Sequence, residues 1–134
     1  MDLISISKFS HIDLRSEHEF HKSTIPNSKN IPILNDTEFE RVGKKYKEKG
    51  QESAIDLGLK IVSGKLKEKR ISKWKEHISF NKGCSIFCFR GGLRSKIAQE
   101  WLSENNTTVE RISGGYKKVR NKVIEKFQND EIYN

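Results

Sequence analysis

Cysteine and proline are scarce in this chain, which has only two of each among its 134 residues. Two cysteines cannot build a disulfide framework. If Cys84 and Cys88 share one extended strand, the four residue steps from one to the other span roughly 13 Å, which is beyond disulfide reach. The cysteine spacing is also poor for a metal site, and the four histidines show no ligand pattern. We therefore expect no bound metal or cofactor, and a reducing cytoplasm fits best.

Long apolar runs are also missing. The opening segment MDLISISKF is too short to cross a membrane, and it lacks the basic start and apolar core of a secretion signal. The sequence therefore predicts no membrane segment. A chain of 134 residues is long enough to form one domain with an ordinary hydrophobic core.

Positive charge is in excess, with 26 Lys and Arg against 18 Asp and Glu, for a formal net charge of +8. Such a surface suits a polyanion, and RNA is the obvious candidate. A lysine-rich composition alone accounts for the same excess. Lys117, Lys118, Arg120 and Lys122 make the last predicted helix the best RNA-facing surface, although a solvated helix face explains them equally well.

Short apolar segments alternate with stretches of helical periodicity. Strands are predicted around residues 4–6, 11–14, 30–33, 84–88 and 107–112. This alternation indicates an α/β fold with a central parallel sheet of about five strands, covered by helices on both faces. We assign residues 1–128 to a single domain and residues 129–134 to a C-terminal tail.

Helix boundaries are marked by capping residues and glycines. Ser16 and Glu19 match a capping box, and Asn35 or Thr37 can cap a longer helix that Gly50 interrupts. Apolar residues then recur at helical spacing up to about residue 80. Further helices are predicted over residues 93–105 and from residue 116 to about 127.

Cys88 is the strongest candidate for chemistry, because it lies between a short buried strand and a predicted helix. A cysteine at such a turn is close to free backbone N–H groups and to the positive end of a helix dipole, which favour the thiolate. Gly91 and Gly92 allow the loop to curl its amides towards one sulfur. The alternative is a buried core cysteine, and Cys84 fits that description better.

The rest of the loop contributes positive charge and a hydroxyl. Arg90 and Arg94 can bind an anionic donor or stabilise a leaving group, unless they are solvated loop arginines. Ser95 can hydrogen-bond the thiolate or merely cap the following helix. Phe89 and Leu93 complete the loop.

Four residues elsewhere in the chain are predicted to support this site. Asp13 and Arg15 lie at the end of a predicted strand, where they form either a structural ion pair or part of the catalytic site. Gly114 and Gly115 are expected to allow a tight strand-to-helix turn rather than to touch the reacting group.

The sequence resembles a rhodanese domain in three places. The segments Asp13–Arg15, Ile25–Pro26 and Asn30–Pro32 are similar to the opening of such a domain. Cys88 and the residues after it resemble the persulfide loop, and the segment 113–116 resembles the closing turn.

Further motifs resemble one family, the tRNA 2-selenouridine synthases. They are the helical insertion at about 36–80, with Val42-Gly43, Tyr46-Lys47, Gly50 and Leu57-Gly58, the loop Cys88-x-Arg90-Gly91-Gly92-Leu93-Arg94-Ser95, and Gly114-Gly115-Tyr116-Lys117-x-x-Arg120. The resemblance covers residues 12–124.

Two departures from the family pattern stand out. Ser23-Thr24-Ile25-Pro26-Asn27 replaces the usual Gly-His-Ile-Pro-Gly, so Thr24 occupies the histidine position and Asn27 that of the second glycine. The family also continues into a P-loop domain, and no G-x4-G-K-[ST] motif occurs in these 134 residues. A split enzyme, an excised domain and a truncated product all fit this second departure.

The resemblance implies rhodanese-type sulfur or selenium transfer. Cys88 would carry the chalcogen as a persulfide or perselenide, with selenophosphate or another donor as substrate and the amides, Arg90 and Arg94 stabilising negative charge. The family converts 2-thiouridine to 2-selenouridine at the tRNA wobble position, with a geranylated thiouridine as the expected intermediate. The implied partners are tRNA and a P-loop domain or protein, without which the chain would not complete the reaction.

Two other functions remain open from the sequence. Cys88 and Arg94 stand in the C-x5-R relation of cysteine phosphatases and arsenate reductases, although Phe87 occupies the usual histidine position and no general acid is evident. The other is a non-catalytic module that docks tRNA or a protein partner through its basic faces.

Overall fold

The computed structural model describes residues 3–133, apart from the side chains of residue 7 and residues 129–133. The helices are α1 (Leu3–Lys8), α2 (Glu17–Lys22), α3 (Asp36–Lys49), α4 (Gln51–Ile61), α5 (Gly64–Phe80), α6 (Leu93–Glu104) and α7 (Gly115–Tyr133). The strands are β1 (His11–Asp13), β2 (Ser28–Asn30), β3 (Ser85–Phe87) and β4 (Glu110–Arg111). The predicted α/β architecture is confirmed.

The four strands form one parallel sheet in the order β2-β1-β3-β4. The sequence predicted about five strands, and the extra one was placed at residues 4–6. That segment is helix α1 instead. Its isoleucines alternate as in a strand, but six residues are too few for periodicity to separate a helix from a strand. Ile6 packs into the core while Ile4 remains exposed.

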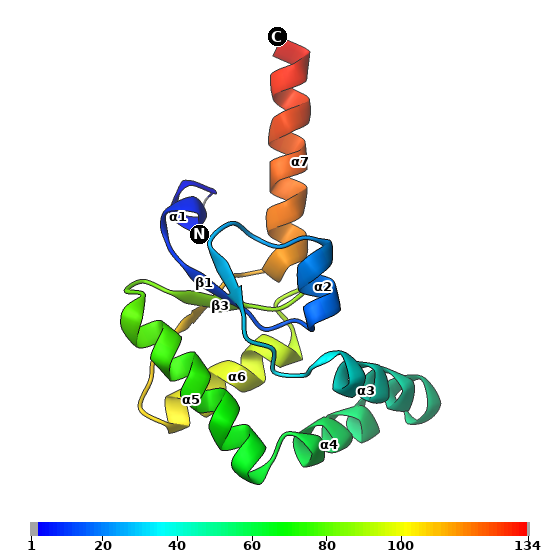
Figure 1. Cartoon of the computed structure of the whole chain (residues 1–134). Coiled ribbons are helices and arrows are strands. Elements are labelled where there is room, and N and C mark those ends of the chain that lie inside the picture. Colours follow the sequence, from blue (N-terminus) through cyan, green and yellow to red (C-terminus); the bar gives the residue numbers. More distant parts are fainter. Residues whose placement is uncertain (1–2, 134) are drawn as a thin grey trace.

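Helices cover both faces of the sheet, with α5 and α6 on one side and α1 and the start of α7 on the other (Figure 1). Successive residues of β3 point to opposite faces, so Ile86 joins the α5–α6 core and Phe87 joins the α1–α7 core. In the larger core Trp74 stacks on Trp101 with ring centroids 6.3 Å apart. The sheet is therefore buried on both sides, as parallel sheets usually are.

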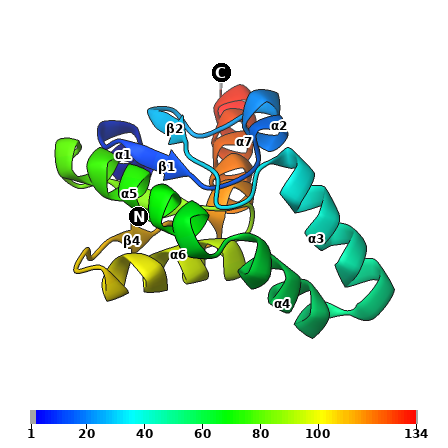
Figure 2. The same cartoon turned by 60° about the horizontal axis from the view of Figure 1, so that its bottom comes forward.

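Within the predicted insertion at about 36–80, α3 and α4 form a helical hairpin that projects beside the sheet (Figure 2), whereas α5 packs on the sheet as part of the core. Of the two caps that the sequence offers, Asn35 and Thr37, it is Asn35 that caps α3, through a capping box with Glu38. Gly50, with φ at 90°, separates the two helices. Arg70 of α5 forms an ion pair with Glu38 at 2.7 Å and donates a hydrogen bond to the Ile33 carbonyl, which ties the hairpin to the domain.

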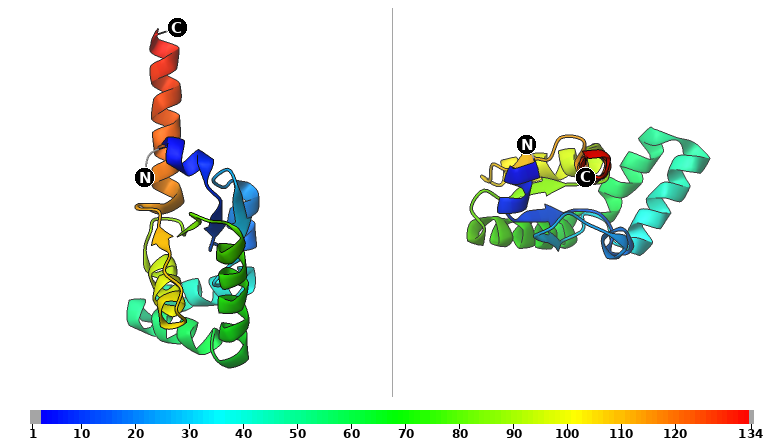
Figure 3. Two further views of the ribbon diagram at one scale, coloured as in Figure 1. Left: turned by 90° about the vertical axis from the view of Figure 1, so that its left-hand side faces the viewer. Right: turned by 90° about the horizontal axis from the view of Figure 1, so that it is seen from above.

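Two boundaries differ from the predicted ones. The helical stretch after Gly50 breaks between Ile61 and Gly64, because Gly64 has φ at 55° and Val62 turns into the core. At the other end of the chain, α7 continues through Tyr133, into the segment assigned to a tail. Side chains from Asn121 to Gln128 are exposed, and this part of α7 extends beyond the rest of the domain (Figure 3).

Replacing Trp74 with alanine is expected to cost about 3–5 kcal/mol of unfolding free energy, as large core truncations do. Trp74 is fully buried, and its Nε1 donates to the Ile31 carbonyl at 2.9 Å. Phe80→Ala, on the same helix but 80% exposed, is the matched control and should change stability by less than about 0.5 kcal/mol. Urea denaturation measures both; equal losses would contradict this assignment of the core.

Candidate functional site

The candidate site lies at the carboxyl ends of the parallel strands, where ligand sites of open α/β sheets are found. Asp13 ends β1, Cys88 directly follows β3 and Arg111 ends β4. The strand register places Asp13 beside Phe87 and Ile86 beside Arg111. Residues that are far apart along the chain therefore meet at one edge of the sheet.

Cys88 is buried, with 2% of the residue exposed, and its thiol donates to the Ser95 hydroxyl with 3.2 Å between Sγ and Oγ. Ser95 belongs to the first turn of α6 and is itself completely buried. The sequence left two roles open for Ser95, a bond to the sulfur and a bond to the helix end. The structure shows the bond to the sulfur but no side-chain cap on α6, and the Ser95 hydroxyl donates instead to the Gly92 carbonyl at 3.3 Å.

The loop after Cys88 rests on the first turn of α7. The backbone N–H of Tyr116 donates to the Cys88 carbonyl at 3.0 Å, and that of Lys117 to the Phe89 carbonyl at 2.9 Å. The first N–H groups of a helix have no partner within the helix, so the loop satisfies them. The amides of α7 thus hold the loop in place through its carbonyl groups.

This contact is possible only because residue 115 is a glycine. Gly115 has φ at 61°, and a Cβ there would collide with the Cys88 carbonyl and lie 2.7 Å from the Gly91 nitrogen. The sequence predicted a tight turn at Gly114 and Gly115, and both residues have positive φ. It did not predict that the turn would pack directly against the Cys88 loop.

The two loop arginines have different surroundings. Arg94 forms an ion pair with Glu19 at 2.7 Å and lies over the Phe39 ring, with its guanidinium carbon 4.6 Å from the ring centroid. Arg94 also holds the pKa of the Glu19 carboxyl below its ordinary value, although burial opposes this shift. Arg90 lies over the Phe89 ring at 5.5 Å and lines a surface hollow with lysines of α7. The guanidinium of Arg94 is therefore already occupied, which does not favour the phosphatase reading.

Arg111 is a site residue that sequence reasoning missed. Its Nε donates to Ser95 Oγ at 3.1 Å, and its Nη2 donates to the carbonyls of Gly91 and Gly92. One signal in the sequence could have identified it. Arg111 stands near the end of the predicted strand at 107–112, so a parallel neighbour of the cysteine strand would bring it to the same edge.

Asp13 and Arg15 form a buried ion pair with 2.8 Å between Arg15 Nη2 and Asp13 Oδ2. Arg15 also donates to the Ser23 carbonyl, and its guanidinium carbon lies 4.2 Å from the centroid of the Tyr116 ring. Of the two roles that the sequence left open, these contacts favour the structural one. The pair joins the segment after β1 to the start of α7.

Thr24 and Asn27, which replace the usual histidine and second glycine, both find a place in the structure of this turn. Thr24, at the position of the usual histidine, donates from its hydroxyl to the buried Asp13 Oδ2 at 2.7 Å. Asn27 has φ at 64°, the left-handed conformation that glycine favours and that asparagine tolerates better than most residues. The turn therefore forms without the second glycine.

Cys84 precedes β3, whereas Cys88 follows it, and both cysteines are free. Burial raises the pKa of the Cys84 thiol to about 11, which keeps it protonated at neutral pH. Cys84 is therefore a buried core residue, as the sequence indicated.

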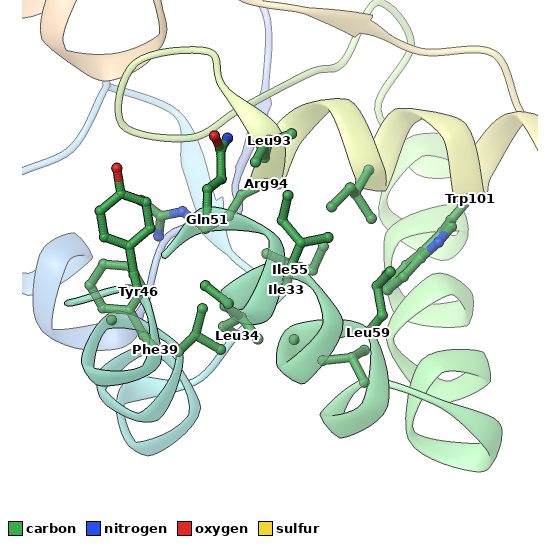
Figure 4. Close-up of a pocket in the computed structure, with 16 residues that line it drawn as sticks. Ile33, Leu34, Phe39, Tyr46, Gln51, Ile55, Leu59, Leu93, Arg94 and Trp101 are labelled. Carbon is green, nitrogen blue, oxygen red and sulfur yellow. The ribbon is translucent and has the colours of Figure 1, made fainter. Parts of the chain in front are cut away.

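A second hollow, of about 270 Å³, opens between the α3–α4 hairpin and α6. Figure 4 shows Phe39 and Tyr46 on one side of it and Leu59 and Trp101 on the other. Leu93 and Arg94 also line it, so this cavity borders the α6 end of the Cys88 loop. No pattern in the sequence indicates this cavity, because its walls come from helices that meet only in the folded chain.

Among the side chains that the structure describes, which exclude residue 7 and residues 129–133, no three His, Cys, Asp or Glu groups gather as a metal site would require. No helix within residues 3–133 is long and apolar enough to cross a membrane.

Gly115→Ala is expected to lower the unfolding free energy by at least about 1–2 kcal/mol, because alanine is strained at this backbone conformation, and to move the Cys88 loop. Gly43→Ala is the control, since a Cβ at that helical position has nothing within 4 Å. Thermal unfolding and the rate of Cys88 alkylation measure the two effects. A Gly115→Ala protein with unchanged stability and alkylation would contradict the described contact.

Comparison with known proteins agrees with this geometry. A family model described as "Rhodanese-like domain" matches residues 2–122. Curated relatives include proteins named tRNA 2-selenouridine synthase from Shewanella denitrificans, 43% identical over 92% of this chain, and from Sulfurovum sp., 45% identical over 87%. This chain covers 34% of each of these two proteins, and so spans about a third of their length.

A solved structure has the same fold. It is the N-terminal domain of a "putative ATP/GTP binding protein" from Clostridium difficile 630, with a TM-score of 0.79 and 34% sequence identity. The match covers 90% of this chain and 92% of that one. On the family match and these similarities, the chain belongs to the rhodanese-like domain family.

Proposed function

We propose that the chain performs rhodanese-type transfer of sulfur or selenium through a persulfide or perselenide on Cys88. The observation that carries the proposal is the position of Cys88, which directly follows β3 in a loop that is held by α7 and bonded through Sγ to Ser95. The family match supports the same chemistry. The donor is proposed to be selenophosphate or another sulfur or selenium compound, and no bound cofactor takes part.

With thiosulfate as a model donor, the step balances without any other reactant. The Cys88 thiolate attacks the outer sulfur, a new S–S bond forms, and the S–S bond of thiosulfate breaks. Sulfite leaves with the bonding electron pair, and the persulfide keeps one negative charge. With selenophosphate the P–Se bond breaks instead, phosphite leaves with the bonding electron pair, and Cys88 keeps the selenium as a perselenide.

Residues around Cys88 have separate roles in this proposal. Ser95 can reverse its hydrogen bond and donate to the thiolate, which stabilises the charge on sulfur. Arg90, which remains at the surface, can attract an anionic donor. Gly91 and Gly115 allow the loop to lie against α7, since a Cβ at either position would crowd the facing backbone, whereas a Cβ at Gly92 would meet nothing within 4 Å.

We further propose that the domain acts in tRNA 2-selenouridine synthesis, which converts 2-thiouridine to 2-selenouridine at the wobble position. This rests on the names of relatives that are 41–45% identical to the chain. Because those relatives are about three times as long, a P-loop domain or protein is proposed to supply the remaining functions. The cytoplasm is the proposed location, since its reducing conditions keep Cys88 free.

The proposed tRNA surface is the basic side of α7 next to the loop. Lys117, Lys118 and Lys122 line one hollow together with Arg90. Phosphate groups bound there would bring RNA close to the Cys88 loop, and the affinity would fall as salt concentration rises.

Incubation with thiosulfate should add the mass of one sulfur atom to the wild-type protein, and cyanide should remove it. Cys88→Ala should take up none, because the attacking thiolate is lost, whereas Cys84→Ala should react as the wild type does. Intact-protein mass spectrometry measures all three. The same measurement should then be repeated with selenophosphate.

Failure of every donor on wild-type protein would contradict sulfur or selenium transfer. A docking module would then be favoured if Cys88→Ala left function intact while charge reversal at Lys117 and Lys118 removed it. Hydrolysis of an aryl phosphate that disappears in Cys88→Ser would instead favour the phosphatase.

The chain alone should not convert 2-thiouridine to 2-selenouridine in tRNA, because the remaining two thirds of its relatives have no counterpart in these 134 residues. Nucleoside analysis of tRNA after incubation with a selenium donor checks this. A full-length relative is the positive control, and efficient turnover by the chain alone would overturn the proposed division of labour.

A further inference from the structure

Arg111 reaches the Cys88 loop from the strand next to β3. Its guanidinium makes three hydrogen bonds to groups around the cysteine, to the Ser95 hydroxyl at 3.1 Å and to the carbonyls of Gly91 and Gly92. Gly91 and Gly92 lie in the loop between β3 and α6, so these bonds tie that loop to the end of β4. Arg111 is half-buried, and an arginine carries its charge at every working pH.

Ser95 connects this charge to the sulfur. A serine hydroxyl has one proton and two acceptor positions, and Arg111 Nε–H occupies one of the acceptor positions. Cys88 Sγ lies at 3.2 Å and the Gly92 carbonyl at 3.3 Å from the same oxygen. When Cys88 is a thiolate, the Ser95 proton can point only to one of these two. A cationic donor on the oxygen polarises the hydroxyl and strengthens the bond that it donates to sulfur.

The bonds to the two carbonyls fix the loop itself. In a trans peptide the C=O and the next N–H point in opposite directions. Because Arg111 binds the carbonyls of Gly91 and Gly92, the following N–H groups, those of Gly92 and Leu93, point away from the guanidinium. Gly91 has φ at 71°, which permits this orientation.

We propose that Arg111 is a positioning residue for Cys88, which acts through Ser95 and the two loop carbonyls to stabilise the thiolate and to hold the loop. This inference rests on the proposed function in taking Cys88 as the reacting group. It gives Arg111 the role that the sequence suggested for Arg94, whose guanidinium is bound by Glu19.

The test is the pH dependence of Cys88 alkylation by iodoacetamide, with peptide mass analysis to separate Cys88 from Cys84. Arg111→Gln should move the midpoint of the rate profile upward by about one pH unit and slow alkylation at neutral pH by about tenfold. Arg111→Lys should give a smaller shift, because it keeps the charge but has no planar group to bridge three acceptors. Arg41→Gln, which removes an exposed charge from α3, is the matched control and should leave the profile unchanged.

A double variant tests the connection through Ser95. If Arg111 acts through the hydroxyl, Arg111→Gln should shift the profile less in a Ser95→Ala background than in the wild type. An unshifted profile in Arg111→Gln, or an equal shift in Arg41→Gln, would overturn the proposal. Far-UV circular dichroism checks folding. If Arg111→Gln does not fold, unchanged profiles in both Arg111→Lys and Ser95→Ala would overturn it.

This experiment is independent of sulfur transfer. A shifted profile in a protein that takes no sulfur or selenium from any of the donors would refute the proposed function and support the role of Arg111. A protein that forms the persulfide normally but shows no shift would do the opposite.

Discussion

The contact between the Cys88 loop and the first turn of α7 is the constraint on which the site depends. The carbonyls of Cys88 and Phe89 accept the N–H groups of Tyr116 and Lys117, so a helix end and a loop satisfy one another. Gly115 permits this approach, because any side chain there would collide with the loop. These backbone hydrogen bonds hold the loop that carries the buried Cys88 against the start of α7.

Four arginines lie around this contact, and they differ in their partners. The Asp13–Arg15 and Arg94–Glu19 ion pairs link α2 and the end of β1 to the loop and to α7. Both arginines are partnered by carboxylates and also lie over aromatic rings. Within the described part of the chain, Arg111 and Arg90 form no ion pair with a carboxylate. Local neighbours therefore decide which arginine can influence an anionic sulfur.

Much of the fold could be predicted from the sequence because its signals are local. The strand-loop-helix at Cys88, the capping boxes at Ser16 and Asn35, the break at Gly50 and the parallel α/β class all follow from patterns within a few residues. The error at residues 4–6 has the same origin, since a six-residue helix and a short strand give similar patterns. The site was only partly predictable. Arg94 and Glu19 are 75 positions apart, and no local pattern relates them.

The sequence by itself singled out Cys88 as the residue expected to react, since it placed one cysteine at a glycine-rich turn between a strand and a helix. It also determined the turn at residues 114–115, because two adjacent glycines permit backbone angles that other residues avoid. Only the tertiary structure decided which arginine is hydrogen-bonded to Ser95, the neighbour of the Cys88 sulfur. The order of the parallel strands brings Arg111 to Ser95, whereas the contact between α2 and α6 pairs Arg94 with Glu19. Hydrogen bonds act over about 3 Å in space whatever the separation along the chain, so their partners are fixed by the fold.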